Sequence, residues 1–377
     1  MSVKSDVIVI GSGVVGNAAA YYLSKKNVGV VVLEGNETIG DGGSSRNAGG
    51  VRQSGRDKRE LPYATYGIRH IWPTLSEELG VDVEYHQGGN LRLGLTEKHM
   101  ETLKKFAEMA NSCGVGVELL NAEQVREKCP YLSEKVVGAS WCPTDGHANP
   151  LKTTLAFYKK AKELGAKYFT GDPVVSLATE KGKIRRAVTR SGAVYEADRI
   201  ILAAGYESRI LSQTVGIDIP MTRFYEECVV TEMQPPMFDI MLGVATGEVY
   251  GHQTEHGSFV FGSDTGLEPT FEYCEGQNKS HPLNMSSNCR AILKYVPCLE
   301  SAKIVRTWGG WMDISYDRVP VIDAVDEVPG LIIGCGMSGH GFGTGPVVGL
   351  ILSQLALGED TVCDLTPLRY DRFHSNF

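Results

Sequence analysis

A glycine-rich turn near the start of the chain constrains the fold more than any other feature. Residues 6–10 read DVIVI, an apolar run that leads directly into Gly11-Ser12-Gly13-Val14-Val15-Gly16. The alanine-rich stretch over residues 17–23 is typical of a helix, and a second apolar run over residues 28–33 ends in Glu34. Strand, tight turn, helix and strand in this order predict a compact βαβ unit of the dinucleotide-binding kind.

Each position of this unit has a physical role in that interpretation. Gly11 permits the tight turn, Gly13 lets backbone amides approach a pyrophosphate, and Gly16 lets the helix pack closely on the strand. The helix N-terminus offers free N–H groups and a partial positive charge to phosphates. Glu34 is placed to accept hydrogen bonds from a ribose, and its charge favours an unphosphorylated one. The alternative is a glycine-rich turn in a parallel sheet that binds no ligand.

Length, charge and cysteine content argue against several other classes of function. A chain of 377 residues is long enough for two domains, and its net charge of −8 argues against nucleic acid as a partner. The nine cysteines form no CxxC or Cys/His cluster, so we expect mostly free thiols, a reducing compartment and no metal site. We find no signal peptide and no membrane span, and expect a soluble, cytoplasmic protein.

Two further stretches carry many glycines and small residues. Residues 40–53 read GDGGSSRNAGGVRQ, which suits neither a strand nor a regular helix, and we expect this loop to contact a ligand; the alternative is a solvated loop. Residues 336–346 form a second glycine loop, between a buried strand over 330–334 and an apolar helix over 347–357. Two such units at opposite ends of the chain suggest one ligand held between them.

The segments between these two ends do not continue the alternation of strand and helix that is typical of βαβ units. Residues 61–78 predict a helix that Pro73 bends or breaks, residues 91–95 alternate like a half-buried strand, and residues 99–111 form an amphipathic helix. A strand and a short helix follow over 117–129. Residues 183–197 suggest a hairpin, residues 199–205 are a buried strand that ends in small residues, and residues 216–310 are β-rich before a helical pattern over 281–297.

Taken together, these motifs resemble the D-amino-acid-oxidase-like superfamily of FAD-dependent amine oxidoreductases. The resemblance extends over most of the chain and is strongest to flavin subunits of sarcosine oxidase, dye-linked proline dehydrogenase, hydroxyproline dehydrogenase and opine oxidase. It rests on the first glycine turn with Glu34, and on Gly43-Ser44-Ser45-Arg46-Asn47-Ala48-Gly49-Gly50, Asp145-Gly146 with Pro150, Ala203-Ala204-Gly205, Arg306-Thr307-Trp308-Gly309-Gly310 and Gly336-Met337-Ser338-Gly339-His340-Gly341-Phe342-Gly343.

The resemblance implies how FAD is held. The first unit would bind the ADP half, Val174 would pack on the adenine, and the two later loops would hold the flavin. Several relatives bind flavin covalently through a cysteine whose position here is Gly310, so we predict non-covalent FAD. The predicted cofactor-binding residues are Gly11, Gly13, Val14, Val15, Gly16, Glu34, Gly35, Gly43, Ser44, Ser45, Arg46, Asn47, Gly49, Gly50, Val174, Ala203, Ala204, Gly205, Gly309, Gly336, Gly339, His340, Gly341, Phe342 and Gly343.

The resemblance is weaker for the substrate. Relatives clamp the substrate carboxylate with cations at the positions of Met312 and Gly343, and neither residue can do so here. Arg52 is the leading replacement, with Arg46 behind it. A bulky substrate is one explanation, with Gly343 and Gly345 leaving room for it. His252 is our candidate for a histidine over the flavin, with Tyr250 and Gln253 beside it; the alternative is a polar loop histidine. His340 suits flavin placement, and His147 and His256 are interpreted as surface or structural.

We therefore predict an α/β and α+β fold, in which a Rossmann-like FAD-binding domain (residues 1–80, 141–215 and 320–377) interleaves with an antiparallel-sheet substrate domain (81–140 and 216–319). The predicted activity is oxidation of the C–N bond of a secondary or D-amino acid, such as sarcosine, proline, hydroxyproline or an opine. Three alternatives remain: an FAD oxidoreductase acting on another amine or a C–OH group, an FAD electron-transfer subunit inactive without its partner, and, less favoured, a nicotinamide dehydrogenase. The resemblance also implies electron-accepting partner subunits in a hetero-oligomer.

Overall fold

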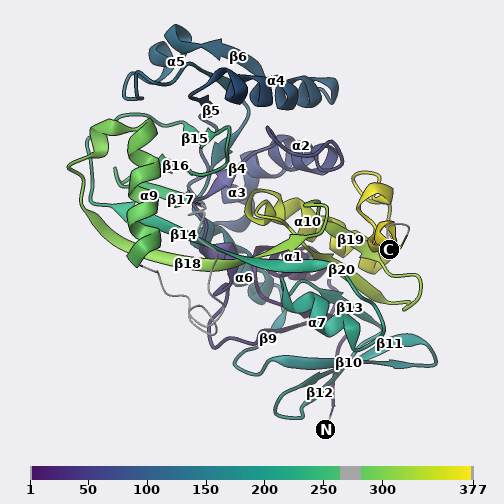
Figure 1. Ribbon diagram of the computed structural model, residues 1–377. Helices are drawn as coiled ribbons and strands as arrows, with labels where there is room; N and C mark the ends of the chain where they lie inside the picture. The colour runs from purple at the N-terminus through teal and green to yellow at the C-terminus, as the bar shows by residue number, and fades with distance from the viewer. Residues whose placement is uncertain (1, 264–281, 375–377) are drawn as a thin grey trace.

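The computed structural model describes residues 2–263 and 282–374, which are built around two large sheets (Figure 1). The first sheet has six strands in the order β19-β20-β13-β2-β3-β9, parallel except for β19. Its strands are β2 (Val7–Ile10), β3 (Val30–Leu33), β9 (Lys167–Phe169), β13 (Arg199–Leu202), β19 (Val321–Ala324) and β20 (Leu331–Cys335). The predicted βαβ unit is therefore present, with β2 in the interior of the sheet.

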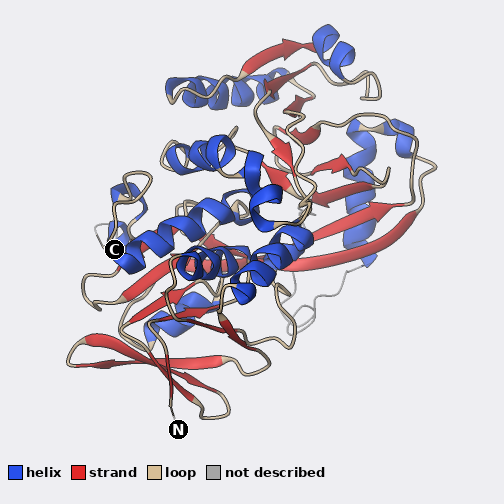
Figure 2. Cartoon of the chain, turned by 180° about the vertical axis from the view of Figure 1, so that it is seen from behind, coloured by secondary structure: helices blue, strands red, loops and turns tan. Residues whose placement is uncertain are grey.

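Both faces of this sheet are buried, which explains its uninterrupted apolar runs. Val7 and Val9 pack among helices, whereas Ile8 and Ile10 pack on the opposite face. The helical layer contains α1 (Val14–Lys25), α6 (Pro150–Glu163), α10 (Gly341–Leu357), α2 (Leu61–His70) and α3 (Leu75–Leu79). Seen from behind, helices gather across the middle of the molecule in front of the strands (Figure 2).

The second sheet has eight strands in the order β18-β14-β17-β16-β15-β5-β7-β6, antiparallel except for the β15–β5 pair. One face packs on α5 (Ala122–Lys128) and α9 (Pro282–Tyr295), and the other faces the loop that follows β3. The strands are β5 (Asn90–Gly94), β6 (Glu118–Asn121), β7 (Gly138–Cys142), β14 (Met221–Thr231), β15 (Met241–Val244), β16 (Tyr250–Gln253), β17 (Phe259–Ser263) and β18 (Ile304–Ser315).

Smaller elements complete the fold. The predicted hairpin forms β11 (Lys183–Thr189) and β12 (Val194–Glu196), which join β10 (Val174–Glu180) and β1 (Val3–Lys4) in a four-stranded sheet near the N-terminus. A two-stranded sheet pairs β4 (Gly50–Val51) with β8 (Gly146–His147). At the opposite end of the molecule from the hairpin, α4 (Glu97–Ser112) lies beside α5 and β6 (Figure 1). α7 (Glu207–Gln213) follows β13.

Several local predictions are confirmed. The helix after residue 60 ends at His70 and a new helix begins at Leu75, so the break around Pro73 is real. The strand followed by a short helix over 117–129 is also present as β6 and α5. The helical pattern after residue 280 is α9, although His281 lies outside the described residues. Within the described ranges, no helix combines the length and the apolar character needed to cross a membrane.

The start of the last helix was predicted wrongly. We expected a loop up to Pro346, but α10 begins at Gly341 and contains Pro346. Glycine and proline disfavour helix, but here tertiary packing outweighs propensity. A Cβ on Gly345 would lie 2.5 Å from Cγ1 of Val14, and one on Gly349 would lie 2.4 Å from the Ala18 Cβ. The glycines therefore allow α10 to approach α1 closely.

Candidate functional site

The first glycine turn has the geometry that a nucleotide cradle requires. Gly11 has a φ of +99°, and a Cβ there would lie 2.4 Å from the carbonyl oxygen of Ala203. A Cβ on Gly16 would lie 2.0 Å from the carbonyl oxygen of Gly11. Gly13 differs, because its Cβ would meet only the side chain of Ser44, with Oγ 2.8 Å away. Gly11 and Gly16 are thus required by backbone packing, whereas the only close neighbour of a Cβ on Gly13, at the N-terminus of α1, is the Ser44 side chain.

Glu34 is held at the mouth of this turn. Its Oε2 accepts hydrogen bonds from the backbone N–H of Ser12 (2.9 Å) and from Ser12 Oγ (2.6 Å), and Oε1 accepts one from the Asn36 N–H (2.9 Å). Next to Glu34, a Cβ on Gly35 would lie 3.0 Å from Pro173, the residue that precedes Val174. The predicted ribose-binding carboxylate and the predicted adenine-packing position are therefore neighbours.

The two later glycine loops meet, although nearly three hundred residues separate them in the sequence. A Cβ on Gly343 would lie 2.8 Å from the carbonyl oxygen of Gly50 and 3.4 Å from the backbone nitrogen of Arg52. Trp72 fixes this contact, because its Nε1–H donates to the carbonyl oxygen of Gly343 (2.8 Å). The expectation that Gly343 and Gly345 leave room for a bulky substrate is therefore wrong. Both glycines serve close backbone packing.

Two carboxylates, those of Asp313 and Glu60, contact the second glycine loop (residues 336–346) from opposite sides. Asp313 accepts a hydrogen bond from the Gly336 N–H (2.6 Å), and burial raises the pKa of this carboxyl to about 6. Glu60 lies 2.8 Å from Nδ1 of His340, just before α10. Burial would raise the pKa of Glu60, but His340 and Arg56 hold it below its usual value. Burial, with the charge of Arg56, lowers the pKa of His340 to about 4, so its ring is neutral near pH 7.

Arg52 and Tyr250, two of the predicted catalytic residues, lie together at the glycine-rich loop over residues 40–53. The Arg52 guanidinium carbon is 5.5 Å from the centre of the Tyr250 ring, and Tyr250 Oη accepts a hydrogen bond from the Ala48 N–H (3.3 Å). Burial raises the pKa of Tyr250 well above its usual range, so the phenol stays protonated. Asp145 fixes the segment after Arg52, because its carboxylate accepts the N–H groups of Gln53 (2.8 Å) and Ser54 (3.2 Å).

His252 lies in strand β16 rather than in a loop. Its ring stacks on that of His147 with centroids 3.8 Å apart and planes 18° apart, and a Cβ on Gly49 would lie 3.3 Å from it. Burial lowers the pKa of both rings, to about 4 for His147 and well below the usual value for His252. Both histidines line a cavity of about 1130 Å³ whose lining does not include Arg52 or Tyr250. Tyr250 lies two residues before His252 in the same strand, so both side chains project from the same face of the sheet.

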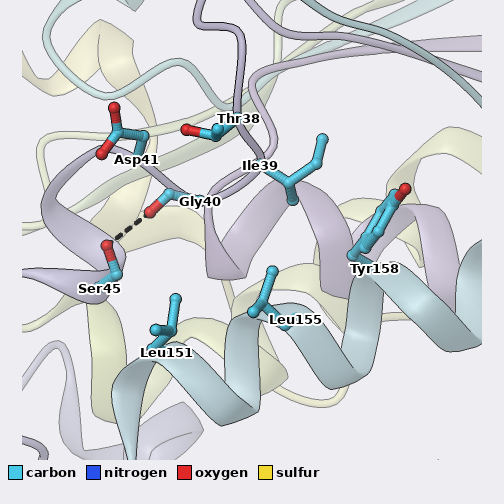
Figure 3. A pocket seen from close by; sticks show the side chains of 8 residues that line it. All are labelled: Thr38, Ile39, Gly40, Asp41, Ser45, Leu151, Leu155 and Tyr158. Carbon is cyan, nitrogen blue, oxygen red and sulfur yellow. Dashed lines mark hydrogen bonds between the residues drawn. The ribbon is translucent and has the colours of Figure 1, made fainter.

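A smaller pocket adjoins this cavity and shares Asp41 and Ser45 with it. It has a volume of about 420 Å³ and lies between the loop after β3 and helix α6. In Figure 3, the side chains of Leu151 and Leu155 rise from α6 toward this loop, which is fixed where Ser45 Oγ donates to the carbonyl oxygen of Gly40 (2.6 Å). The pocket therefore presents exposed leucines beside residues of the first loop.

The remaining predicted positions lie around the first loop and at the end of β13. Ser44 Oγ accepts the Val14 N–H (2.9 Å), which joins the loop to α1. A Cβ on Gly310 would lie 2.7 Å from the Arg46 Cβ, so Arg46 lies against the position for which the resemblance implied a cysteine in several relatives. Gly309 faces the other side of the sheet, where a Cβ would lie 2.4 Å from the Tyr225 ring. Ala204 and Gly205 follow β13 next to Gly11.

These features fit FAD as one extended ligand. The α1 N-terminus, the space beside Gly13 and the carboxylate of Glu34 suit a pyrophosphate and a ribose. The meeting loops, with the N-terminus of α10 behind them, suit the electron-rich end of a flavin. Among the described residues, no group of three His, Cys, Asp or Glu side chains has the arrangement of a metal site.

Sequence reasoning missed three residues that the fold brings to this region. Asp145 was noted only as part of a motif, although its burial among backbone N–H donors makes it the anchor of the Arg52 segment. Arg92 was interpreted only as a polar position of an alternating strand, and Asn90 was not singled out. The alternation places them on the face of β5 opposite the core leucines Leu91 and Leu93, and only the sheet order shows that this face looks toward Arg52.

Comparison with known proteins agrees with this geometry. The family model described as DAO, FAD dependent oxidoreductase, matches residues 6–355. The chain is 27% identical to the sarcosine oxidase beta subunit of Arthrobacter sp, over 98% of this chain and 91% of that protein. It is 26% identical to a subunit of the opine oxidase of Rhizobium meliloti, over 97% and 98%. Its fold matches the crystal structure of L-proline dehydrogenase from P. horikoshii with a TM-score of 0.90 and 28% identity, covering 100% of this chain and 99% of that one.

Proposed function

This chain belongs to the DAO family of FAD-dependent oxidoreductases, and on that premise we propose that it oxidises the C–N bond of a secondary or D-amino acid. Sarcosine, proline, hydroxyproline and opine-like N-alkyl amino acids are the leading substrates. The names of the similar proteins, which are subunits of a sarcosine oxidase and of an opine oxidase, support this substrate class.

One observation supports an amino acid as the substrate above all. Arg52 presents a guanidinium beside Tyr250, next to the place where the two glycine loops meet. No ion pair joins that guanidinium to any side chain in the described part of the chain. A fixed cation without a partner is a natural site for a substrate carboxylate.

The chain's own residues would then bind and orient the substrate. Arg52 holds the carboxylate, and Tyr250, which stays protonated, offers a hydroxyl and an aromatic face beside it. FAD, held by the turn before α1 and by the two later glycine loops, would supply the two-electron oxidant for hydride removal from the carbon next to nitrogen, and water would hydrolyse the resulting imine to an amine and a carbonyl compound. The reaction needs the amine in its neutral form, and nearby arginines favour loss of its proton. His252 and His147 are neutral near pH 7 and add no charge.

We also propose the arrangement of the chain in its assembly. Residues 1–80, 141–215 and 320–377 form the FAD-binding domain, and residues 81–140 and 216–319 form the substrate domain. The relatives named as subunits of larger oxidases support a partner subunit that accepts electrons. The competing function, an FAD oxidoreductase for another amine or a C–OH donor, is favoured by Met312 and Gly343, which remove the cations that relatives use.

Turnover with an artificial electron acceptor tests the proposal. The purified, FAD-loaded chain is supplied with a dye acceptor and with sarcosine, L- and D-proline, hydroxyproline, other D-amino acids and an opine. Dye reduction with at least one of them supports the proposal, and the carbonyl product identifies the bond that was oxidised. Dye reduction only by amines that lack a carboxylate, or by alcohols, would instead support the competing function. If the chain is silent alone but active when its partner is added, it is an electron-transfer subunit.

A further inference from the structure

Several polar atoms without partners gather around Gly243 on the second sheet. Gly243 and Arg92 are register partners in the β15–β5 pair. A Cβ on Gly243 would lie 3.5 Å from Cγ of Arg92, 3.7 Å from Nη1 of Arg52 and 3.9 Å from Oδ1 of Asn90. Nε of Arg52, Nε of Arg92 and Oδ1 of Asn90 are all buried without a hydrogen-bond partner in the described part of the chain. Buried polar groups are normally paired, so this position is expected to receive a ligand.

The charges at this place do not balance. Neither the Arg52 nor the Arg92 guanidinium forms an ion pair or a hydrogen bond with a side chain among residues 2–263 and 282–374. The nearby carboxylates balance these cations only in part, because Asp145 attracts both Arg52 and Arg92 while it accepts backbone N–H groups, and Glu60 attracts Arg56 while it contacts His340. Arg56 adds a third positive charge, and its Nε–H donates to the carbonyl oxygen of Arg52.

Burial and the neighbouring cations both affect the pKa of Arg92. Burial, with the charges of Arg52 and Arg56, lowers the pKa of Arg92 to about 9, far from the usual value for arginine. Placing like charges together away from water is costly unless an anion accompanies them. Arg52 and Arg92 each keep part of their surface exposed, although the Nε atom of each is buried.

The two guanidiniums occupy different places relative to the glycine loops. Arg52 lies beside Tyr250, and a Cβ on Gly50 would be 3.1 Å from its Nε. The Arg92 guanidinium lies farther along the same segment, where a Cβ on Gly55 would be 1.6 Å from its Nη1, and its guanidinium carbon is 5.5 Å from the centre of the Phe106 ring of α4. A ligand that satisfies both cations must therefore carry negative charge at two points.

Building on the proposed function, we propose that Arg92 forms a second carboxylate subsite beside Arg52, with Asn90 next to both. The substrate class is then a secondary amine with two carboxylates, an N-(carboxyalkyl) amino acid. One carboxylate binds Arg52 close to the reacting carbon, and the other binds Arg92 farther out. Asn90 Oδ1 can accept a hydrogen bond from a ligand N–H.

Binding of unreactive acids tests this without turnover. Titration calorimetry on the FAD-loaded protein compares succinate, glutarate and adipate with butyrate. Because each charge-assisted contact is worth about 1.5–3 kcal/mol, the best dicarboxylate should bind about 10- to 100-fold more tightly than butyrate. Arg92→Gln should reduce its affinity to the level of butyrate and leave butyrate itself unchanged. Arg126→Gln, a change at an exposed arginine of α5, is the matched control and should alter neither.

Two further variants keep the test decisive if Arg92→Gln folds poorly. Arg92→Lys keeps the charge and should retain part of the preference, whereas Gly243→Leu fills the space between the cations and should abolish it. Equal binding of butyrate and of every dicarboxylate by the wild type would overturn the proposal. So would a loss of butyrate binding in Arg92→Gln, because one carboxylate would then bridge both arginines.

These results separate the inference from the proposed function. A chain that oxidises sarcosine or proline but shows no dicarboxylate preference refutes the second subsite alone. A chain that binds dicarboxylates through Arg92 but oxidises no amino acid refutes the proposed reaction alone.

Discussion

Gly13 offers a substitution that separates cofactor binding from folding. Its φ of −69° and ψ of −178° are open to any residue, so Gly13→Val introduces little backbone strain. The new Cβ would meet only the side chain of Ser44, whose Oγ lies 2.8 Å from the Cβ position and accepts the Val14 N–H. Losing that hydrogen bond costs about 0.5–1.5 kcal/mol. Replacing glycine restricts the unfolded chain and returns about 0.4–1 kcal/mol. The free energy of unfolding of the apoprotein should therefore change by no more than about 1 kcal/mol.

The effect on FAD should be far larger. The valine side chain would occupy the space where backbone N–H groups approach the pyrophosphate. Losing two charge-assisted hydrogen bonds, at about 1.5–3 kcal/mol each, lowers the FAD affinity by at least about 100-fold. Gly16→Ala should behave differently, because its Cβ would lie 2.0 Å from the Gly11 carbonyl oxygen and would destabilise the fold itself.

The assay combines urea unfolding of each apoprotein with a fluorescence titration of FAD and the flavin absorbance of the purified protein. Gly116→Val is the matched control, because Gly116 is exposed and a Cβ there meets nothing within 4 Å. We expect Gly13→Val to be folded and colourless, and Gly116→Val to be folded and yellow. A yellow, fully loaded Gly13→Val protein would refute the placement of the pyrophosphate. An unfolded one would refute our interpretation of Gly13 as free of packing constraints.

Three further predictions follow from the site. Arg52→Ala should weaken binding of the amino-acid substrate by about 10- to 100-fold and leave the FAD affinity unchanged, as measured by parallel titrations; unchanged substrate affinity would remove Arg52 from the carboxylate site. Acid precipitation should release all flavin into the supernatant, because Gly310 occupies the position at which the resemblance implies a flavin-binding cysteine in several relatives; flavin retained in the pellet would contradict this. His147 has a pKa of about 4 when folded and about 6.5 when unfolded, so the unfolded state binds the extra proton. Its contribution to stability is therefore complete above pH 6.5 and falls by up to about 3 kcal/mol as pH drops toward 4. When urea unfolding is measured across this pH range, the free energy of unfolding should depend less steeply on pH for His147→Gln than for the wild type. An equal pH dependence would contradict the assignment.

The nucleotide half of the site was predictable because its signals are local. Gly11, Gly13, Gly16 and Glu34 lie within one βαβ unit, where sequence spacing fixes spatial arrangement. The closeness of the first and the last glycine turn was also predicted, because a strand, a glycine turn and a helix occur at each end of the chain; in the structure, β2 and β20 flank β13. The fold class therefore followed from the order of elements.

The substrate half depends on contacts that sequence spacing does not reveal. The alternation around Leu91 and Leu93 placed Arg92 on a polar face, but only the pairing of β5 with β15 brings it to Gly243 and Arg52. Gly343 and Gly345 were expected to leave room for a bulky substrate because a glycine has no side chain. In the structure that space is filled by backbone and by Val14, which sequence alone does not place.

The most direct test of the whole account is an anaerobic absorption spectrum of the purified chain before and after adding secondary and D-amino acids, including an N-(carboxyalkyl) amino acid. We predict an oxidised flavin spectrum that at least one of these compounds bleaches, since hydride transfer to FAD requires no partner subunit. A flavin that stays oxidised with every amino acid, but is reduced by an alcohol or an amine without a carboxylate, would contradict the proposed reaction.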